Sequence, residues 1–144
     1  MVKIAGAQFA GSTDRGKNLD RIVRAVTEAA DRGARVVCLP ELSTSIYFCY
    51  EANHRHFDYA ESIPGPSTEE VSALAKRLGV SVVLPLFERV AEGQFYNSAV
   101  VISSEGELLG ARRRGHDEIG HGRAVDRSET EERGRRADRH RATQ

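Results

Sequence analysis

Apolar and polar positions alternate in a regular way over residues 1–110 of the chain. An apolar run at Val2–Phe9 predicts a first strand. From Asn18 to Arg32, apolar residues recur at helical spacing, and Gly33 stands where a helix usually ends. Arg35–Leu39 is a continuous apolar run, which is typical of a strand in a sheet that is covered on both faces. The chain therefore opens with the order strand, helix, strand.

A second helix and a hairpin follow a long loop over residues 41–62. Ser67 and Glu70 fit a capping box at the start of this helix, and Gly79 stands at its end. Its inner stripe comprises Val71, Leu74, Ala75 and Leu78. Three more strands are predicted at Val80–Val90, Phe95–Ser103 and Glu107–Gly110. This order of elements predicts an α/β fold in which helices pack on a mixed sheet.

The apolar pattern ends at Gly110. Residues 111–144 contain only two large apolar residues, Ile119 and Val125. Such a composition buries too little apolar surface to offset the entropy of ordering the chain. Residues 111–144 are therefore predicted to be a disordered, Arg-rich C-terminal tail, with at most a solvated helix within 126–139. The abrupt rise in Arg and Gly also suggests a shift of reading frame, in which case an alternate frame would resume the earlier pattern.

Charge and composition argue against several classes of function. Lys and Arg number 21, as do Asp and Glu, so no net charge attracts nucleic acid or an anionic membrane. Residues 1–110 hold 11 basic and 14 acidic residues, whereas residues 111–144 hold 10 arginines and 7 acids. A polyanion-binding tail is the weaker alternative, because acids are interspersed and aromatic residues are lacking. We expect no nucleic-acid partner and no membrane partner.

The N-terminus, the length of the apolar runs and the two cysteines indicate a cytoplasmic protein. The N-terminus lacks the apolar core of a signal peptide, and no apolar run is long enough to cross a bilayer. Cys38 and Cys49 form no CxxC motif, which suggests reduced thiols. Cys38, inside a predicted strand, is expected to be a small buried apolar residue.

Glu41 is the strongest candidate for chemistry. It follows Pro40 at the end of the predicted strand Arg35–Leu39, and α/β proteins place their sites at strand ends. Apolar neighbours there would suit a carboxylate to act as a general base. The alternative is an ordinary surface acid. Cys49, in the loop that follows, is a weak candidate for a nucleophile.

Other chemical signals in the same loop are weaker. His54 and His56 form an H-x-H pair, but no carboxylate or cysteine pattern completes a metal site, so a solvated loop is favoured. Four aromatic residues could line a pocket or could simply pack in the loop and core. They are Tyr47, Phe48, Tyr50 and Tyr96.

Several segments resemble the nitrilase, or carbon–nitrogen hydrolase, superfamily, and they are collinear from Lys3 to about Gly110. They are AQF, GARVVCLPEL, YFC, AESIPGPSTE, LAKRLGVSVVLPLFER and YNSAVVISSEGELLG. The similarity is greatest to the branch that hydrolyses N-carbamoylputrescine, with the branch that acts on N-carbamoyl-β-amino acids as the near rival. The resemblance implies a nitrilase-like α-β-β-α sandwich, of which this chain forms part. It also implies assembly into dimers or larger oligomers, and neither a metal nor an organic cofactor.

The resemblance further implies a Glu-Lys-Cys mechanism. Glu41 matches the general base of the family. The family segment G-x-Y-R-K-x-H matches GARRRGH at residues 110–116, which places Arg114 at the lysine position and Arg112 at the tyrosine position. Arginine is not an equivalent donor, because it is planar, bulky and never neutral. The nucleophilic cysteine of the family follows a later strand, and neither Cys38 nor Cys49 matches it.

These features together predict a carbon–nitrogen hydrolase family protein for small amide or carbamoyl substrates that is inactive as a 144-residue chain. The alternative is a non-catalytic fragment or a binding module derived from that family. Residues 1–110 are interpreted as the N-terminal part of the hydrolase domain. Their apolar strands are expected to leave an exposed face or an unpaired edge, and hence to cause self-association.

Overall fold

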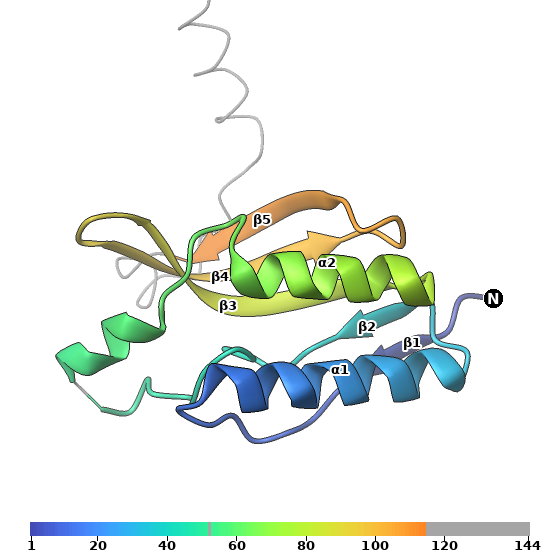
Figure 1. Ribbon diagram of the computed structural model, residues 1–144, viewed down its shortest axis with the longest axis horizontal. Helices are drawn as coiled ribbons and strands as arrows, with labels where there is room; N and C mark the ends of the chain where they lie inside the picture. The colour runs from blue at the N-terminus through green and yellow to red at the C-terminus, as the bar shows by residue number, and fades with distance from the viewer. Residues whose placement is uncertain (52, 115–144) are drawn as a thin grey trace, which may run out of the picture.

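A five-stranded mixed sheet with two long helices forms the framework of the protein (Figure 1). The computed structural model describes residues 1–51 and 53–114. The strands are β1 (Ile4–Gly6), β2 (Val36–Cys38), β3 (Ser81–Ala91), β4 (Gln94–Ile102) and β5 (Leu108–Arg114). They lie in chain order across the sheet: β1, β2 and β3 run parallel, and β3, β4 and β5 run antiparallel. The predicted mixed α/β sheet is thereby confirmed.

Local side-chain hydrogen bonds determine where the helices begin. Helix α1 (Arg15–Asp31) starts earlier than predicted, because the Asp14 carboxylate accepts a hydrogen bond of 3.1 Å from the Lys17 N–H. Helix α2 (Pro66–Leu78) follows the short 3₁₀ helix η1 (His54–Tyr59).

The predicted capping box at Ser67 and Glu70 is wrong. The hydroxyl of Thr68 accepts a hydrogen bond from the Gly65 N–H at 2.7 Å and donates one to the Gly65 carbonyl at 2.8 Å. The helix therefore begins nearer the N-terminus, with Gly65 as its N-cap and Pro66 as its first residue, and Thr68 supplies the capping side chain. At the other end, Gly79 has a φ of 62° and closes α2 as predicted.

The core lies between the two helices and one face of the sheet. Alternate residues of β3 and β4 point toward the helices and are fully buried, as the period of two in a strand requires. The main members are Leu19, Ile22, Val26, Val37, Val71, Leu74, Val82, Leu84, Leu86, Val100 and Ile102. The inner stripe predicted for α2 is thereby confirmed, with Leu78 partly buried at its end.

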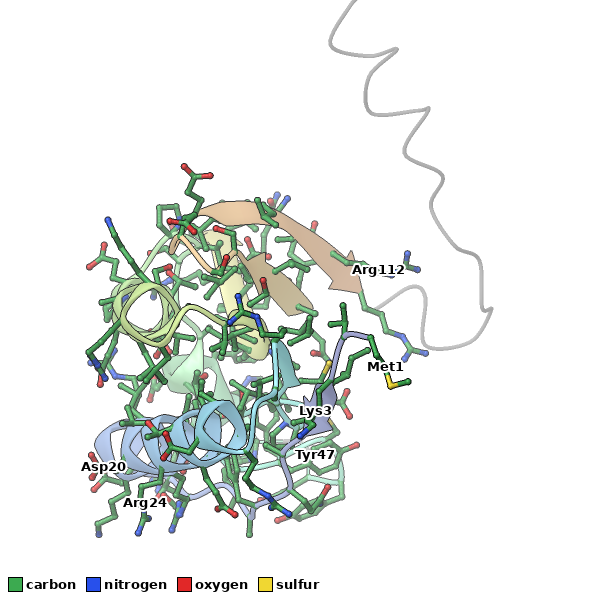
Figure 2. All side chains as sticks on the ribbon, turned by 90° about the vertical axis from the view of Figure 1, so that its right-hand side faces the viewer. Met1, Lys3, Asp20, Arg24, Tyr47 and Arg112 are labelled. Carbon is green, nitrogen blue, oxygen red and sulfur yellow. The ribbon has the colours of Figure 1, made fainter. Side chains whose placement is uncertain are left out.

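The opposite face of the sheet, termed the open face, is covered by neither α1 nor α2 (Figure 2). Ile4 is 67% exposed and Val101 is 39% exposed, and both lie on this face. The prediction that Cys38 is buried is wrong, because side chains alternate along β2. Val37 points to the helices, whereas Cys38 points to the open face and is exposed.

Strand β5 extends farther than the sequence pattern predicted. It pairs with β4 from Leu108 to Arg114 and so continues past Gly110, the predicted end of the apolar pattern. Residues 111–114 therefore belong to the sheet rather than to a tail, because their backbone groups complete the ladder with β4. The predictions for residues 115–144 lie outside the described residues. Within the described residues, no helix is both long enough and apolar enough to span a bilayer.

Candidate active site

Glu41 stands where β2 ends and a long loop begins. The segment is tied to β3, because the Leu39 N–H bonds to the Val83 carbonyl at 3.1 Å. The N–H and hydroxyl of Ser43 both donate to the Pro85 carbonyl, at 3.0 and 2.7 Å. Leu42, buried between these anchors, has a φ of 51°, a left-handed conformation that leucine seldom adopts. The surrounding contacts thus hold the backbone beside Glu41 in an uncommon conformation.

A hydrogen bond links Glu41 to the antiparallel part of the sheet. The side-chain amide of Asn97 on β4 donates to Oε1 of Glu41 at 2.6 Å, although the two residues are 56 positions apart. Arg114 on β5 lies directly opposite Asn97 in the strand register. Cross-strand partners share a face of the sheet, so Arg114 projects on the face that carries Glu41. The fold thus brings together the two site residues that the resemblance singled out.

Glu41 itself is exposed. The apolar neighbours expected from the sequence do not enclose it in the described part of the chain. The reason is that Glu41 follows the end of β2 on the open face, away from the helix layer.

A second carboxylate, Glu88 on β3, was missed by sequence reasoning. It is buried and accepts hydrogen bonds from Arg113 Nε and Nη2, each at 2.7 Å, and from the Ser98 hydroxyl at 2.6 Å. Burial favours the neutral acid, but the hydrogen bonds from Arg113 and Ser98, together with the charge of Arg113, outweigh it and lower the pKa of Glu88. The pair ties β5 to β3, which holds the neighbouring Arg114 in its place beside Asn97.

One signal in the sequence could have revealed Glu88. Residues 82, 84 and 86 of the predicted strand are apolar and point to the core, and Glu88 continues the same phase. An acid at a core-facing position needs a buried hydrogen-bonding partner.

Glu88 should make the protein sensitive to acid. A carboxyl with a lowered pKa in the folded state stabilises the fold above its ordinary pKa of 4.5, and that contribution is lost as the pH falls through the lower folded-state value. We expect Glu88→Gln to reduce the slope of unfolding free energy against pH in this acidic range, in urea unfolding at successive pH values. The exposed Glu105→Gln should keep the wild-type slope. Equal slopes for wild type and Glu88→Gln would contradict this assignment.

An aromatic cluster fixes the loop that follows Glu41. Phe87 of β3 contacts Phe48 edge-on at 5.0 Å between ring centroids and stacks with Phe95 at 5.5 Å. Phe57 packs on Phe95 at 4.5 Å. Of the four aromatics proposed as pocket lining, Phe48 belongs to this cluster, whereas Tyr47 and Tyr50 are 48% and 76% exposed. The cluster thus covers one end of the open face and anchors the loop.

The prediction of a solvated loop is wrong for His56. Its side chain is only 13% exposed and stacks on Phe48 at 4.9 Å between ring centroids, with Nε2 at 3.4 Å from a Glu51 carboxylate oxygen. The aromatic neighbours of the 3₁₀ helix draw this ring inward, whereas His54 stays exposed. Within residues 1–51 and 53–114, no group of three or more His, Cys, Asp or Glu side chains is placed to hold a metal ion.

Tyr47 and Cys49 lie near Glu41 at the rim of the site. The charge of an ionised Cys49 thiol, its hydrogen bond with the phenol, and then the Glu41 carboxylate raise the pKa of Tyr47 above its ordinary value. Cys49 is exposed. In the described part of the chain, the Glu41 carboxylate therefore lies near a phenol and an exposed thiol, and Arg114 projects on the same face of the sheet.

Comparison with known proteins relates the chain to a family. The family model for carbon–nitrogen hydrolases matches residues 3–138. The chain belongs to the carbon–nitrogen hydrolase family. The match continues past Gly110, where the sequence pattern had suggested that the resemblance ends.

Curated relatives of this chain are amidase-type proteins. It is 35% identical to an omega-amidase from Xenopus tropicalis, over 79% of this chain and 40% of the relative. It is 34% identical to an N-carbamoylputrescine amidase from Solanum lycopersicum (81% and 39%) and 30% identical to a citrullinase from Francisella tularensis (83% and 43%). The chain spans about two fifths of the length of the curated relatives it matches.

Solved structures support the same fold. A carbon–nitrogen hydrolase from Helicobacter pylori G27 superposes with a TM-score of 0.74 at 29% identity, covering 84% of this chain and 42% of the other. An amidase from Nesterenkonia sp. has a TM-score of 0.61 at 22% identity, which supports the fold alone. The predicted nitrilase-like fold of this chain is confirmed.

Proposed function

We propose that this chain carries the general-base part of an active site that hydrolyses linear amide or carbamoyl C–N bonds in small molecules. Glu41 would accept the proton of a nucleophilic thiol, because a carboxylate beside a thiol generates the reactive thiolate. The thiolate attacks the carbonyl carbon, the amine or ammonia leaves, and water hydrolyses the thioester. Family membership and the relatives named omega-amidase, citrullinase and N-carbamoylputrescine amidase support this class of substrate.

The hydrogen bond from Asn97 to Glu41 carries the proposal. It holds the carboxylate through Oε1 at 2.6 Å, and no described residue hydrogen-bonds to Oε2, which is left to receive a proton. Arg114, opposite Asn97, adds a positive charge on the same face. The lysine of the family pattern at this position would stabilise the oxyanion that forms when a thiolate attacks a carbonyl group, and Arg114 is not an equivalent donor.

We further propose that the 144-residue chain by itself does not turn over substrate. Neither Cys38 nor Cys49 matches the position of the family nucleophile, and loss of the nucleophile removes nearly all of the covalent route. A non-catalytic binding module is the second candidate. It is favoured by Arg112 and Arg114, which stand exposed where the family pattern has tyrosine and lysine.

Purified chain is therefore expected to release no ammonia above background from N-carbamoylputrescine, N-carbamoyl-β-alanine or simple nitriles. A chimera tests the base: residues 1–114 are joined to the remaining part of the Xenopus tropicalis omega-amidase, with Arg114→Lys to restore the family cation. This chimera should release ammonia from an ω-amide, and Glu41→Gln should lower kcat about 1000-fold or more.

The exposed Glu51→Gln serves as the matched control in the chimera and should leave kcat unchanged. A chimera as active with Glu41→Gln as without it would refute the role of Glu41. Turnover by the unmodified chain that disappears with Cys49→Ser would refute the proposed inactivity and identify Cys49 as the thiol. Binding of N-carbamoylputrescine by the chain without turnover, measured by calorimetry, would favour the binding module.

A further inference from the structure

Leu42 has an unusual backbone conformation. Its φ is 51°, and no other non-glycine residue in the described part of the chain has a positive φ. This left-handed conformation brings the Cβ atom close to the following carbonyl oxygen, so it costs free energy in any residue that has a side chain. Asparagine and aspartate adopt it more often than other residues, and leucine seldom does. A strained residue that directly follows the candidate base, Glu41, requires a physical explanation.

Burial of the Leu42 side chain holds this backbone in place. The side chain is 2% exposed and belongs to a buried cluster with Ala60 and Phe87. The backbone that follows is fixed as well, since the N–H and the hydroxyl of Ser43 both donate to the Pro85 carbonyl. Burial of a leucine side chain is enough to offset the cost of one left-handed residue. Packing therefore maintains a conformation that leucine would seldom adopt by itself.

The left-handed turn allows two consecutive side chains to reach the same face of the sheet. Successive side chains of an extended chain point to opposite sides. Here the Glu41 carboxylate accepts a hydrogen bond from Asn97, whereas Leu42 packs in the cluster of Phe87. Asn97 and Phe87 lie directly opposite each other on β4 and β3, so both contacts are made at neighbouring points of the open face. An extended backbone at Leu42 would turn one of the two side chains away.

We propose that Leu42 is a positioning residue for Glu41. Its buried side chain holds the left-handed backbone, and that backbone directs the Glu41 carboxylate to Asn97. Catalytic groups act efficiently when the packing around them fixes the productive orientation. The consequence for catalysis rests on the proposed role of Glu41 as a base, whereas the effect on the hydrogen bond between Asn97 and Glu41 does not.

Two substitutions of similar volume separate the backbone conformation from burial. Leu42→Ile keeps the number of buried atoms but is branched at Cβ, which strongly disfavours a left-handed backbone. Leu42→Met is unbranched at Cβ and should keep the backbone of the wild type. A cooperative thermal melt establishes that each variant folds. If Leu42→Ile does not fold, Leu42→Ala is measured in its place and judged by the same criteria, because its lost contacts no longer hold the left-handed backbone.

The side-chain amide of Asn97 reports the hydrogen bond in the isotope-labelled 144-residue chain. Its NMR signals in Glu41→Gln mark the state without a bond to a carboxylate, because a neutral acceptor binds an N–H more weakly than a charged one. Leu42→Ile should move the wild-type signals most of the way to that position. Leu42→Met should leave them in place.

Leu74→Ala is the matched control for lost stability. Leu74 is a leucine of α2 with 1% exposure, and it belongs to the main core rather than to the cluster of Leu42. Its truncation leaves a cavity and lowers the free energy of unfolding. The Asn97 signals should nevertheless stay at the wild-type position, because the backbone beside Glu41 is unchanged.

Kinetics in the chimera of the proposed function test the consequence for catalysis. Leu42→Ile should lower kcat by about tenfold or more and keep KM within about twofold, because a misplaced base affects the chemical step more than substrate binding. Leu42→Met and Leu74→Ala should keep the kcat of the chimera when each is assayed below its melting temperature.

Several results would overturn the proposal. They are Asn97 signals that Leu42→Ile leaves at the wild-type position, an equal displacement by Leu42→Met, and an equal displacement by Leu74→Ala. In a chimera that depends on Glu41, an unchanged kcat with Leu42→Ile would also overturn it and leave the proposed function standing. If the chimera does not depend on Glu41, the proposed function fails, and the Asn97 signals alone decide whether Leu42 positions the carboxylate.

Discussion

Replacing Arg113 by methionine is expected to lower the free energy of unfolding by about 3 kcal/mol. The physical reason is the buried Glu88 carboxylate, which accepts two hydrogen bonds from Arg113 at 2.7 Å each. Without the guanidinium, a charged group stays in a site that excludes water, with only the Ser98 hydroxyl to satisfy it. Arg113 is itself 48% exposed, which places the expected effect at the lower end of the range for buried pairs.

The neighbouring arginines provide matched controls. Arg112 and Arg114 lie in the same strand, project to the open face and are exposed. Arg112→Met and Arg114→Met should each change stability by less than about 0.5 kcal/mol. Urea unfolding followed by circular dichroism measures all three variants under the same conditions. Similar losses in the three would show that Arg113 has no special role.

A double substitution distinguishes two causes of the lower stability. One is the lost attraction between Arg113 and Glu88, and the other is the buried Glu88 carboxylate that is left without a partner. The pair Glu88→Leu and Arg113→Met removes both partners, so no buried carboxylate is left unpaired. We expect the double variant to be at least as stable as Arg113→Met alone, because replacing both partners of a buried ion pair by apolar residues is often close to neutral. If the double variant lost as much free energy of unfolding as the two single variants together, the unpaired Glu88 carboxylate would not explain the effect of Arg113→Met.

Replacing Phe87 by alanine is also expected to lower the free energy of unfolding by about 3 kcal/mol. The Phe87 ring is 8% exposed and contacts Phe48 and Phe95, so its removal opens a cavity beneath the loop of residues 41–62. That loop begins at Glu41. The substitution should therefore free the loop as well as weaken the fold, and limited proteolysis should cleave first within residues 41–62.

Tyr50→Ala is the control for the loop. Its ring is 76% exposed in the same segment, so removing it should change stability by less than about 0.5 kcal/mol. Thermal unfolding and limited proteolysis with mass spectrometry report the two expected effects of Phe87→Ala separately. Unchanged cleavage together with a lower melting temperature would show that Phe87 supports the core without holding the loop.

The arrangement of the site explains why sequence reasoning found some of its residues and not others. Glu41 was identified because the end of an apolar strand and a family motif coincide there. Asn97 was part of a quoted motif, yet its contact with Glu41 depends on the place of β4 beside β3 and on the loop that carries Glu41 over the open face. No local pattern encodes a contact across 56 positions.

The sequence by itself determined the order of the five strands and the two α-helices, the inner stripe of α2, its end at Gly79 and the family. These properties follow from residue spacing and from local backbone preferences, which act over a few residues. Only the tertiary structure decided that Cys38 is exposed, that Arg113 rather than Arg114 pairs with Glu88, and that β1 is an outer strand of the sheet that the described residues form. Each of these depends on which face of the sheet the helices cover and on strand register, because a shift of one residue sends every side chain of a strand to the opposite face.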